Sequence, residues 1–124
     1  MARYIVTKSG NKTLVPTEPK AVAIFEQAAS IEASNFDPFA SNIARERVFK
    51  PFFGQKTDED RVQEYSTTLT GKLEGYERIL SKTKYLAGNE LTIVDLFHLP
   101  YGSMLEPQGI TLLSDEAKYP NVAR

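Results

Sequence analysis

Residues 84–96 read KYLAGNELTIVDL, and this stretch predicts where a helix begins. Thr92 at the N-cap can accept a hydrogen bond from the Asp95 N–H, and the Asp95 carboxylate can accept one in return from the Thr92 N–H. Leu91 precedes the cap and Leu96 follows one turn later, which is the spacing of a hydrophobic staple. An N-cap stabilises a helix by about 1 kcal/mol. We therefore predict a structural capping box and staple.

Two longer helices are predicted before this stretch. Apolar residues between Lys20 and about Phe53 recur every three or four positions, and Asp37-Pro38 is expected to interrupt this helix because proline has no N–H to donate. A second helix is predicted from Thr57, as N-cap, to Leu80, with charged residues opposite an apolar face. That face carries Val62, Tyr65, Leu69, Leu73, Tyr76 and Leu80. Without a convincing strand pair, the predicted fold class is all-α, a helical bundle.

The composition is typical of one soluble globular domain. The chain has 124 residues, of which 41% are hydrophobic and 25% charged. Fifteen Lys and Arg balance sixteen Asp and Glu, and both signs are spread along the chain. No electrostatic footprint for nucleic acid or an anionic membrane results, and no apolar run approaches a membrane span. We expect neither nucleic acid nor membrane as a partner.

Cysteine and histidine usage excludes several kinds of site. The chain has no cysteine, so disulfides, thiolate metal sites and cysteine nucleophiles are absent. His98 is the only histidine and cannot build a two-imidazole zinc site, so no metal site is predicted. His98 is expected to be structural, bonded to a backbone carbonyl or a neighbouring side chain. Asp95 is likewise expected to be a helix cap and not a general base.

The same stretch resembles the C-terminal helical domain of glutathione transferases. Tyr85-Leu86-Ala87-Gly88 matches the family's aromatic-Leu-x-Gly, and Thr92-Ile93-Val94-Asp95 matches its Thr or Ser-x-x-Asp. The continuation DLFHLP at residues 95–100 is similar to the phi-class form Asp-Leu-x-His-Leu-Pro.

Two further segments resemble the phi class. VFKPFFG at residues 48–54 is one, and LEGYE at residues 73–77 matches the class's Leu-x-x-Tyr-Glu. The resemblance runs from about Arg3 to Arg124 and indicates a phi-like class of the fungal or plant type.

The resemblance also implies a domain organisation. Residues 1–19 would be the remnant of a preceding thioredoxin-like domain plus a linker, and residues 20–124 the helical C-terminal domain. Residues 14–19 are consistent with an extended linker, because Pro16 and Pro19 each disfavour helix at the residue before them. Residues 119–124 resemble the entry to a further helix. The chain is expected to be truncated at both ends, with its last helix incomplete.

By this resemblance, the chain is the electrophile-pocket domain of an enzyme that conjugates glutathione to hydrophobic electrophiles. Glutathione is the co-substrate of the intact family enzyme, and no cofactor is implied. No position matches the family's catalytic serine, so no catalytic residue is predicted and the chain alone is expected to be inactive. The intact protein is expected to be a cytoplasmic homodimer acting in detoxification. The alternative is a non-catalytic interaction module of the same fold, as in translation elongation factor gamma subunits.

The family's pocket-lining positions on the first long helix fall on Arg45 and Phe49, which are the predicted substrate-binding residues. Phe52 and Phe53 are weaker candidates. The alternative for Phe49 is a place in the core, where aromatic residues at helical spacing more often lie. Arg45 departs from the aromatic residue often found at its position, and its alternative is a solvated surface residue.

Overall fold

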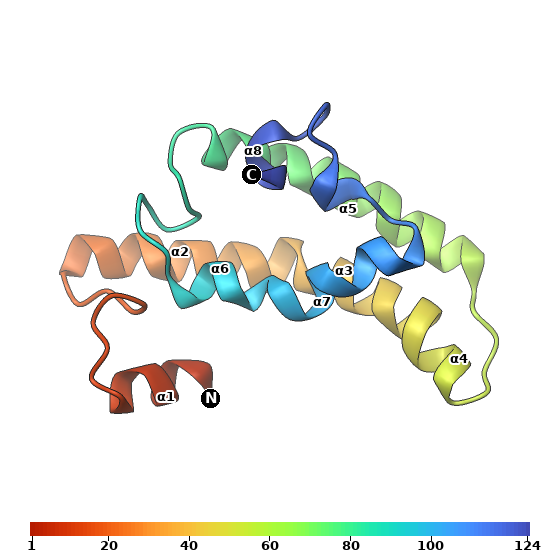
Figure 1. The fold of residues 1–124 in the computed structure, drawn as a ribbon, viewed down its shortest axis with the longest axis horizontal. Coiled ribbons are helices and arrows are strands. Elements are labelled where there is room, and N and C mark those ends of the chain that lie inside the picture. The colour runs from red at the N-terminus through yellow and green to blue at the C-terminus, as the bar shows by residue number, and fades with distance from the viewer.

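The computed structural model describes residues 1–124 and consists of helices joined by loops, without a β-sheet (Figure 1). This confirms the predicted all-α fold class. The elements in chain order are α1 (Ala2–Lys8), α2 (Pro19–Asn35), α3 (Asp37–Ala44), the π-helical turn η1 (Arg45–Phe49), α4 (Lys50–Phe52), α5 (Glu59–Leu80), α6 (Ile93–Phe97), α7 (Leu99–Leu105), the 3-10 turns η2 (Glu106–Gln108) and η3 (Leu112–Ser114), and α8 (Pro120–Ala123).

Two long helical segments form the frame of the molecule (Figure 1). The first runs from α2 through α3 and η1 to α4, and α5 returns against α3. α6 contacts α2, α7 contacts α3, and α8 lies against α5. The helices α2, α3, α5, α6 and α7 therefore each bury residues against a neighbour, as a bundle requires.

The first segment is interrupted where Asp37-Pro38 predicted it. α2 ends at Asn35, and α3 begins at Asp37 with Pro38 near its N-terminus. Phe36 lies between the two helices and is buried. The predicted apolar face of α5 is also confirmed. The main core consists of Phe36, Ala40, Ile43, Val62, Leu69, Leu73, Tyr76, Leu105, Ile110 and Tyr119.

The predicted N-cap of α5 is wrong by one residue. The cap is Asp58, whose carboxylate accepts from the Arg61 N–H at 3.2 Å. The Thr57 hydroxyl instead donates to the Glu46 carbonyl at 2.8 Å. An aspartate next to the threonine can take over the cap because its carboxylate suits the positive end of the helix.

The segment before α2 is tied to the rest of the chain. α2 begins at Pro19, one residue earlier than predicted, and the Glu18 carboxylate caps it by accepting from two backbone N–H groups. These hydrogen bonds lower the pKa of Glu18. The Leu14 carbonyl accepts from the Ile93 N–H at 3.0 Å, which joins the linker to the start of α6. A second, smaller core forms there from Phe25, Ala28, Ala29, Ile93 and Val94.

α1 is attached to α2 at the surface and contains no buried residue. Arg3 forms an ion pair with Glu26, and its guanidinium lies 5.1 Å from the centroid of the Phe25 ring. No helix is long and apolar enough to cross a bilayer. No group of three or more His, Asp or Glu is placed to hold a metal ion.

Candidate functional site

The two predicted substrate-binding residues are the first and last of the π-helical turn η1. There the Lys50 N–H donates to the Arg45 carbonyl five residues back. Pro51 has no N–H, so the Glu46 carbonyl has no donor five residues ahead, and it accepts from the Thr57 hydroxyl instead. π-helical turns are rare and occur frequently at functional sites.

Glu46 stabilises the η1 turn through the hydrogen bonds of its side chain. Its side chain is buried, and the carboxylate accepts from Lys50 Nζ at 2.6 Å and from the Asp58 N–H at 3.0 Å. The hydrogen bond from Lys50 lowers the pKa of the Glu46 carboxyl and outweighs the effect of burial. Glu46 is therefore ionised at neutral pH and joins η1 to the start of α5.

Arg47 attaches the turn to two further elements. Its Nη2 lies 2.7 Å from Glu59 Oε2 at the start of α5, and its Nη1 donates to the Gln108 carbonyl in η2. η1 is thus anchored on both sides by charged residues that do not belong to the predicted pocket.

The predicted pocket residues themselves lie at the surface. Arg45 is exposed, and Phe49 is 38% exposed, so Phe49 is not a core residue. Phe52 and Phe53 are 80% and 71% exposed, and their rings meet edge-to-face with centroids 5.3 Å apart. The α4 end of the first helical segment therefore presents two largely exposed phenylalanine rings, Phe52 and Phe53, and next to them the partly exposed ring of Phe49.

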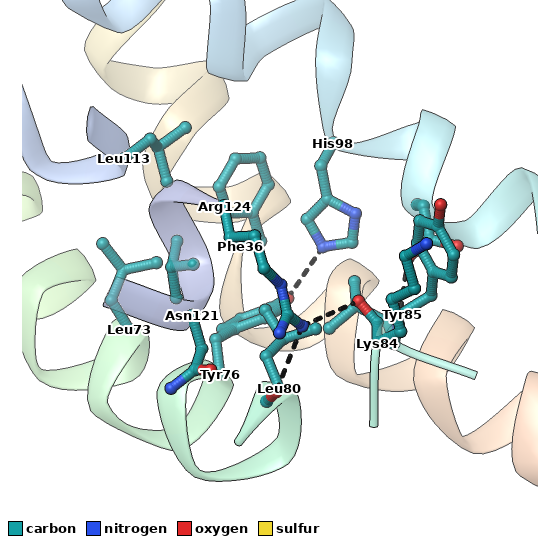
Figure 2. A pocket seen from close by; sticks show the side chains of 13 residues that line it. Phe36, Leu73, Tyr76, Leu80, Lys84, Tyr85, His98, Leu113, Asn121 and Arg124 are labelled. Atoms are coloured by element: carbon teal, nitrogen blue, oxygen red, sulfur yellow. Dashed lines mark hydrogen bonds between the residues drawn. The ribbon is translucent and has the colours of Figure 1, made fainter. Parts of the chain in front are cut away.

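A separate cavity of about 300 Å³ opens between α5, α6 and α8 (Figure 2). Neither Arg45 nor Phe49 lines it. Its lining residues are Phe36, Leu73, Tyr76, Leu80, Lys84, Tyr85, Leu86, Asp95, His98, Leu113, Asn121, Val122 and Arg124.

His98 and Tyr76 form a hydrogen-bonded pair in the cavity wall (Figure 2). His98 Nδ1 lies 2.8 Å from the Val94 carbonyl, which can only accept, so Nδ1 carries the proton. The neutral ring therefore accepts at Nε2 from the Tyr76 hydroxyl, 3.0 Å away. Burial lowers the pKa of His98, although the Val94 carbonyl and Asp95 oppose it. His98 was expected to bond to a backbone carbonyl or to a neighbouring side chain, and both kinds of partner are present.

Tyr76 belongs to the core as well as to the cavity. Burial raises the pKa of its hydroxyl, and the negative charge of Glu32 adds to the effect. The hydroxyl therefore stays protonated and can donate to His98 throughout the ordinary pH range.

Thr92 and Asp95 form the capping box at the start of α6. The Asp95 carboxylate accepts from the Thr92 N–H at 2.9 Å and, with its other oxygen, from the Leu86 N–H at 3.0 Å. The second bond was not predicted, and it fixes the loop that forms one edge of the cavity. Leu91 and Leu96 are 41% and 39% exposed, and the staple between them stays a prediction.

Glu77 was missed by sequence reasoning, although it lies in the LEGYE segment. Its carboxylate accepts from the backbone N–H groups of Asn121 and Val122 at 3.0–3.1 Å. Burial alone would raise the pKa of Glu77, but the hydrogen bonds from Asn121 and Val122 outweigh it and lower the pKa. Glu77 thus fastens the start of α8 to α5, where α8 closes one side of the cavity.

Comparison with known proteins identifies the domain. The family described as "Glutathione S-transferase, C-terminal domain" matches residues 36–124, from the residue between α2 and α3 to the last residue. The chain belongs to the glutathione S-transferase family. The resemblance seen in the sequence is confirmed.

The curated relatives of this glutathione S-transferase domain include plant and fungal proteins. Glutathione S-transferase PM239X14 of Arabidopsis thaliana is 51% identical over 119 residues, covering 94% of the chain and 55% of the relative. Glutathione S-transferase hmp2 of Hypomyces subiculosus is 39% identical over 129 residues, covering 100% of the chain and 59% of the relative. The chain thus spans little more than half the length of these two relatives.

Solved structures show the same fold. Glutathione transferase F2 of Populus trichocarpa superposes with a TM-score of 0.85 at 27% identity, covering 97% of the chain and 58% of that structure. Glutathione S-transferase I of maize, in complex with an atrazine glutathione conjugate, gives a TM-score of 0.70 at 25% identity, covering 98% and 65%. The Populus and maize structures are phi-class plant enzymes, as the DLFHLP segment predicted.

Proposed function

We propose that this chain is the electrophile-pocket domain of a transferase that conjugates glutathione to hydrophobic electrophiles. Family membership over residues 36–124 carries the proposal. The maize enzyme, whose structure holds an atrazine glutathione conjugate, supports this class of reaction. The named relatives and structures are all transferases, and no observation favours an elongation-factor-type interaction module.

Arg45 and Phe49 would form part of the electrophile site. Small-molecule sites combine apolar and aromatic walls with a few polar groups, and the η1 turn offers both kinds of side chain at the surface. Phe49 supplies an apolar face for the electrophile, and Arg45 makes the wall partly polar. Glu46 and Arg47 are positioning residues, because their hydrogen bonds hold the turn that carries Arg45 and Phe49.

The nucleophile would come from outside this chain. Conjugation requires the thiolate of glutathione, whose pKa must be lowered by a hydrogen-bond donor or a positive dipole. We assign that task to a preceding thioredoxin-like domain, of which residues 1–19 are the last helix and the linker. The absence of any buried residue in α1 supports this assignment, because such a helix contributes little to the helical domain's own core. Glutathione would be a co-substrate and not a cofactor, and the intact protein a cytoplasmic homodimer.

A chimera tests the proposal. Residues 20–124 are joined to the glutathione-binding half of the Arabidopsis relative, and conjugation of 1-chloro-2,4-dinitrobenzene is measured. We expect activity in the chimera and none in the isolated chain. Phe49→Ala is expected to raise KM for the electrophile about three- to tenfold, through loss of apolar contact, with KM for glutathione unchanged.

Arg61→Ala is the control, because Arg61 is exposed on α5. An inactive chimera alongside an active parent enzyme would contradict the transferase assignment. Equal effects of Phe49→Ala and Arg61→Ala would contradict only the placement of the pocket.

A further inference from the structure

The π-helical hydrogen bond of η1 is flanked by α-helical ones. The Arg45 N–H donates to the Ser41 carbonyl, four residues back. The Phe53 N–H likewise donates to the Phe49 carbonyl at 3.1 Å, four residues back. Between them, the Lys50 N–H donates to the Arg45 carbonyl, five residues back. Since π-helical turns are rare, a contact at η1 must favour this hydrogen-bond register over the α-helical one.

Pro51 leaves one carbonyl without a backbone donor in either register, because proline has no N–H. In the observed π-helical register that carbonyl belongs to Glu46, five residues back. In an α-helical register it would belong to Arg47, four residues back. A donor placed beside one of these two carbonyls therefore determines which register is more stable.

Thr57 places such a donor beside Glu46. Its half-buried hydroxyl, in the loop before α5, donates to the Glu46 carbonyl at 2.8 Å. A carbonyl left unpaired away from water costs free energy, so this bond stabilises the π-helical register. The Asp58 N–H also donates to Glu46, but to the carboxylate, at 3.0 Å. A carboxylate can keep its bond by changing side-chain torsions, whereas a carbonyl moves with the main chain, so the Thr57 bond is the one that depends on the register.

We propose that Thr57, through its hydroxyl, selects the π-helical register of η1 and is thereby a positioning residue for Phe49, whose side chain is 38% exposed. The register sets how far the helix has turned between α3 and Phe49, and therefore where the ring points. In the α-helical register, one residue would pass from η1 into the loop before α5. The role of Phe49 in the electrophile site rests on the proposed function, whereas the register does not.

Scalar couplings across hydrogen bonds test the register on the full 124-residue chain. In an isotope-labelled chain, such a coupling identifies the carbonyl that accepts from the Lys50 N–H. We expect Arg45 to be this acceptor in the unchanged chain and in Thr57→Ser, which keeps the hydroxyl. Thr57→Val has nearly the same shape without the hydroxyl, and there the coupling to Arg45 should be replaced by one to Glu46. Thr57→Ala also lacks the hydroxyl and should behave in the same way.

Thr67→Val is the matched control for the loss of a threonine hydroxyl. Thr67 is exposed on α5, and its hydroxyl also donates to a backbone carbonyl, that of Gln63, at 2.9 Å. In this variant the Lys50 N–H should still donate to Arg45.

The consequence for the electrophile is measured in the chimera that tests the proposed function. Thr57→Val is expected to raise KM for 1-chloro-2,4-dinitrobenzene about three- to tenfold, as Phe49→Ala does, with kcat and KM for glutathione unchanged. The hydroxyl of Thr57→Ser should rescue KM, and Thr67→Val should have no effect. A purely structural role of Thr57 would instead lower the amount of folded enzyme and leave KM unchanged.

The two measurements separate the possible failures. Retention of the Arg45 coupling in Thr57→Val and Thr57→Ala, or its loss without a coupling to Glu46, would overturn the proposal whether or not the chimera is active. In an active chimera that responds to Phe49→Ala, an unchanged KM in Thr57→Val would overturn the positioning role. An inactive chimera would contradict the proposed function, and the couplings alone would then decide whether Thr57 sets the register.

Discussion

Phenylalanine side chains are buried in the α2–α3 part of the first helical segment and exposed at its α4 end. Phe25 and Phe36 are 1% and 2% exposed, whereas Phe52 and Phe53 are 80% and 71% exposed. α5, α6 and α7 pack over α2 and α3, but no helix of the chain lies over the last two rings. Helical spacing of aromatic residues thus predicts a shared face, while burial depends on what lies opposite. The predictions below test this contrast, beginning with the largest effect.

Phe36 should contribute most to stability. Its ring lies 6.2 Å from the Tyr76 ring and 4.7 Å from the His98 ring, centroid to centroid, in the main core. Phe36→Ala is expected to lower the free energy of unfolding by about 3–5 kcal/mol, since it leaves a cavity. Urea denaturation followed by circular dichroism measures the change. Phe36→Leu fills more of the space and should cost less than half as much. If Phe36→Ala lowered the free energy of unfolding by less than ~1 kcal/mol, the buried and the exposed phenylalanines would not differ in their contribution to stability.

Glu46 is the exception at the α4 end, because it is charged and yet buried. Glu46→Ala leaves Lys50 and the Asp58 N–H without their acceptor, and we expect a loss of about 2–3 kcal/mol. The same denaturation experiment applies. Glu74 is exposed on α5, and Glu74→Ala should change stability by less than ~0.5 kcal/mol. If Glu46→Ala and Glu74→Ala changed the free energy of unfolding equally, the η1 turn would be stable without the Glu46 carboxylate.

His98 should make the free energy of unfolding depend on pH. Its pKa is lowered on folding, so the unfolded chain takes up a proton first as the pH falls below the ordinary value of 6.5. Stability is therefore full well above that pH and declines below it, by at most about 1.4 kcal/mol at pH 5.5. His98→Gln should flatten this part of the stability–pH curve. Denaturation at pH 7.5 and 5.5 tests it, and an unchanged slope in the variant would assign the decline to other groups.

Phe53 should contribute least. Phe53→Ser exposes no new core surface and is expected to change the free energy of unfolding by less than ~0.5 kcal/mol. Denaturation measured at two protein concentrations checks both stability and self-association. A cost above ~1 kcal/mol that grows with concentration would mean that a second copy covers this ring.

Sequence reasoning succeeded where the controlling interactions are local. The apolar face of α5 follows from spacing alone, and Pro38 marks the break between α2 and α3. The capping box of Thr92 and Asp95 lies within four residues. Phe49 was predicted on the first helical segment and lies there, in η1, but its spacing did not predict that its side chain would be 38% exposed.

Contacts between residues far apart in the sequence were not predicted. Glu46 is buried, and its carboxylate accepts from the Asp58 N–H, which a loop brings to it. Thr57 was expected to cap α5, but the unpaired Glu46 carbonyl takes its hydroxyl. The cavity joins Phe36, His98 and Arg124, which lie far apart in the sequence, and no local pattern indicates it.

The five-residue turn from Arg45 to Phe49 also affects alignment with relatives. A π-helical turn holds one residue more than an α-helical turn between the same two ends. A homologue that is α-helical here has one residue fewer between Ile43 and Pro51, and the gap belongs inside η1. A pocket position that is assigned by counting back from Phe49 then differs by one residue from the position assigned by counting forward from Phe36. A shift of one residue moves the chosen side chain by about 100° around the helix. Superposition of coordinates, and not pairwise identity, is the basis on which substrate-contacting positions of this domain should be matched.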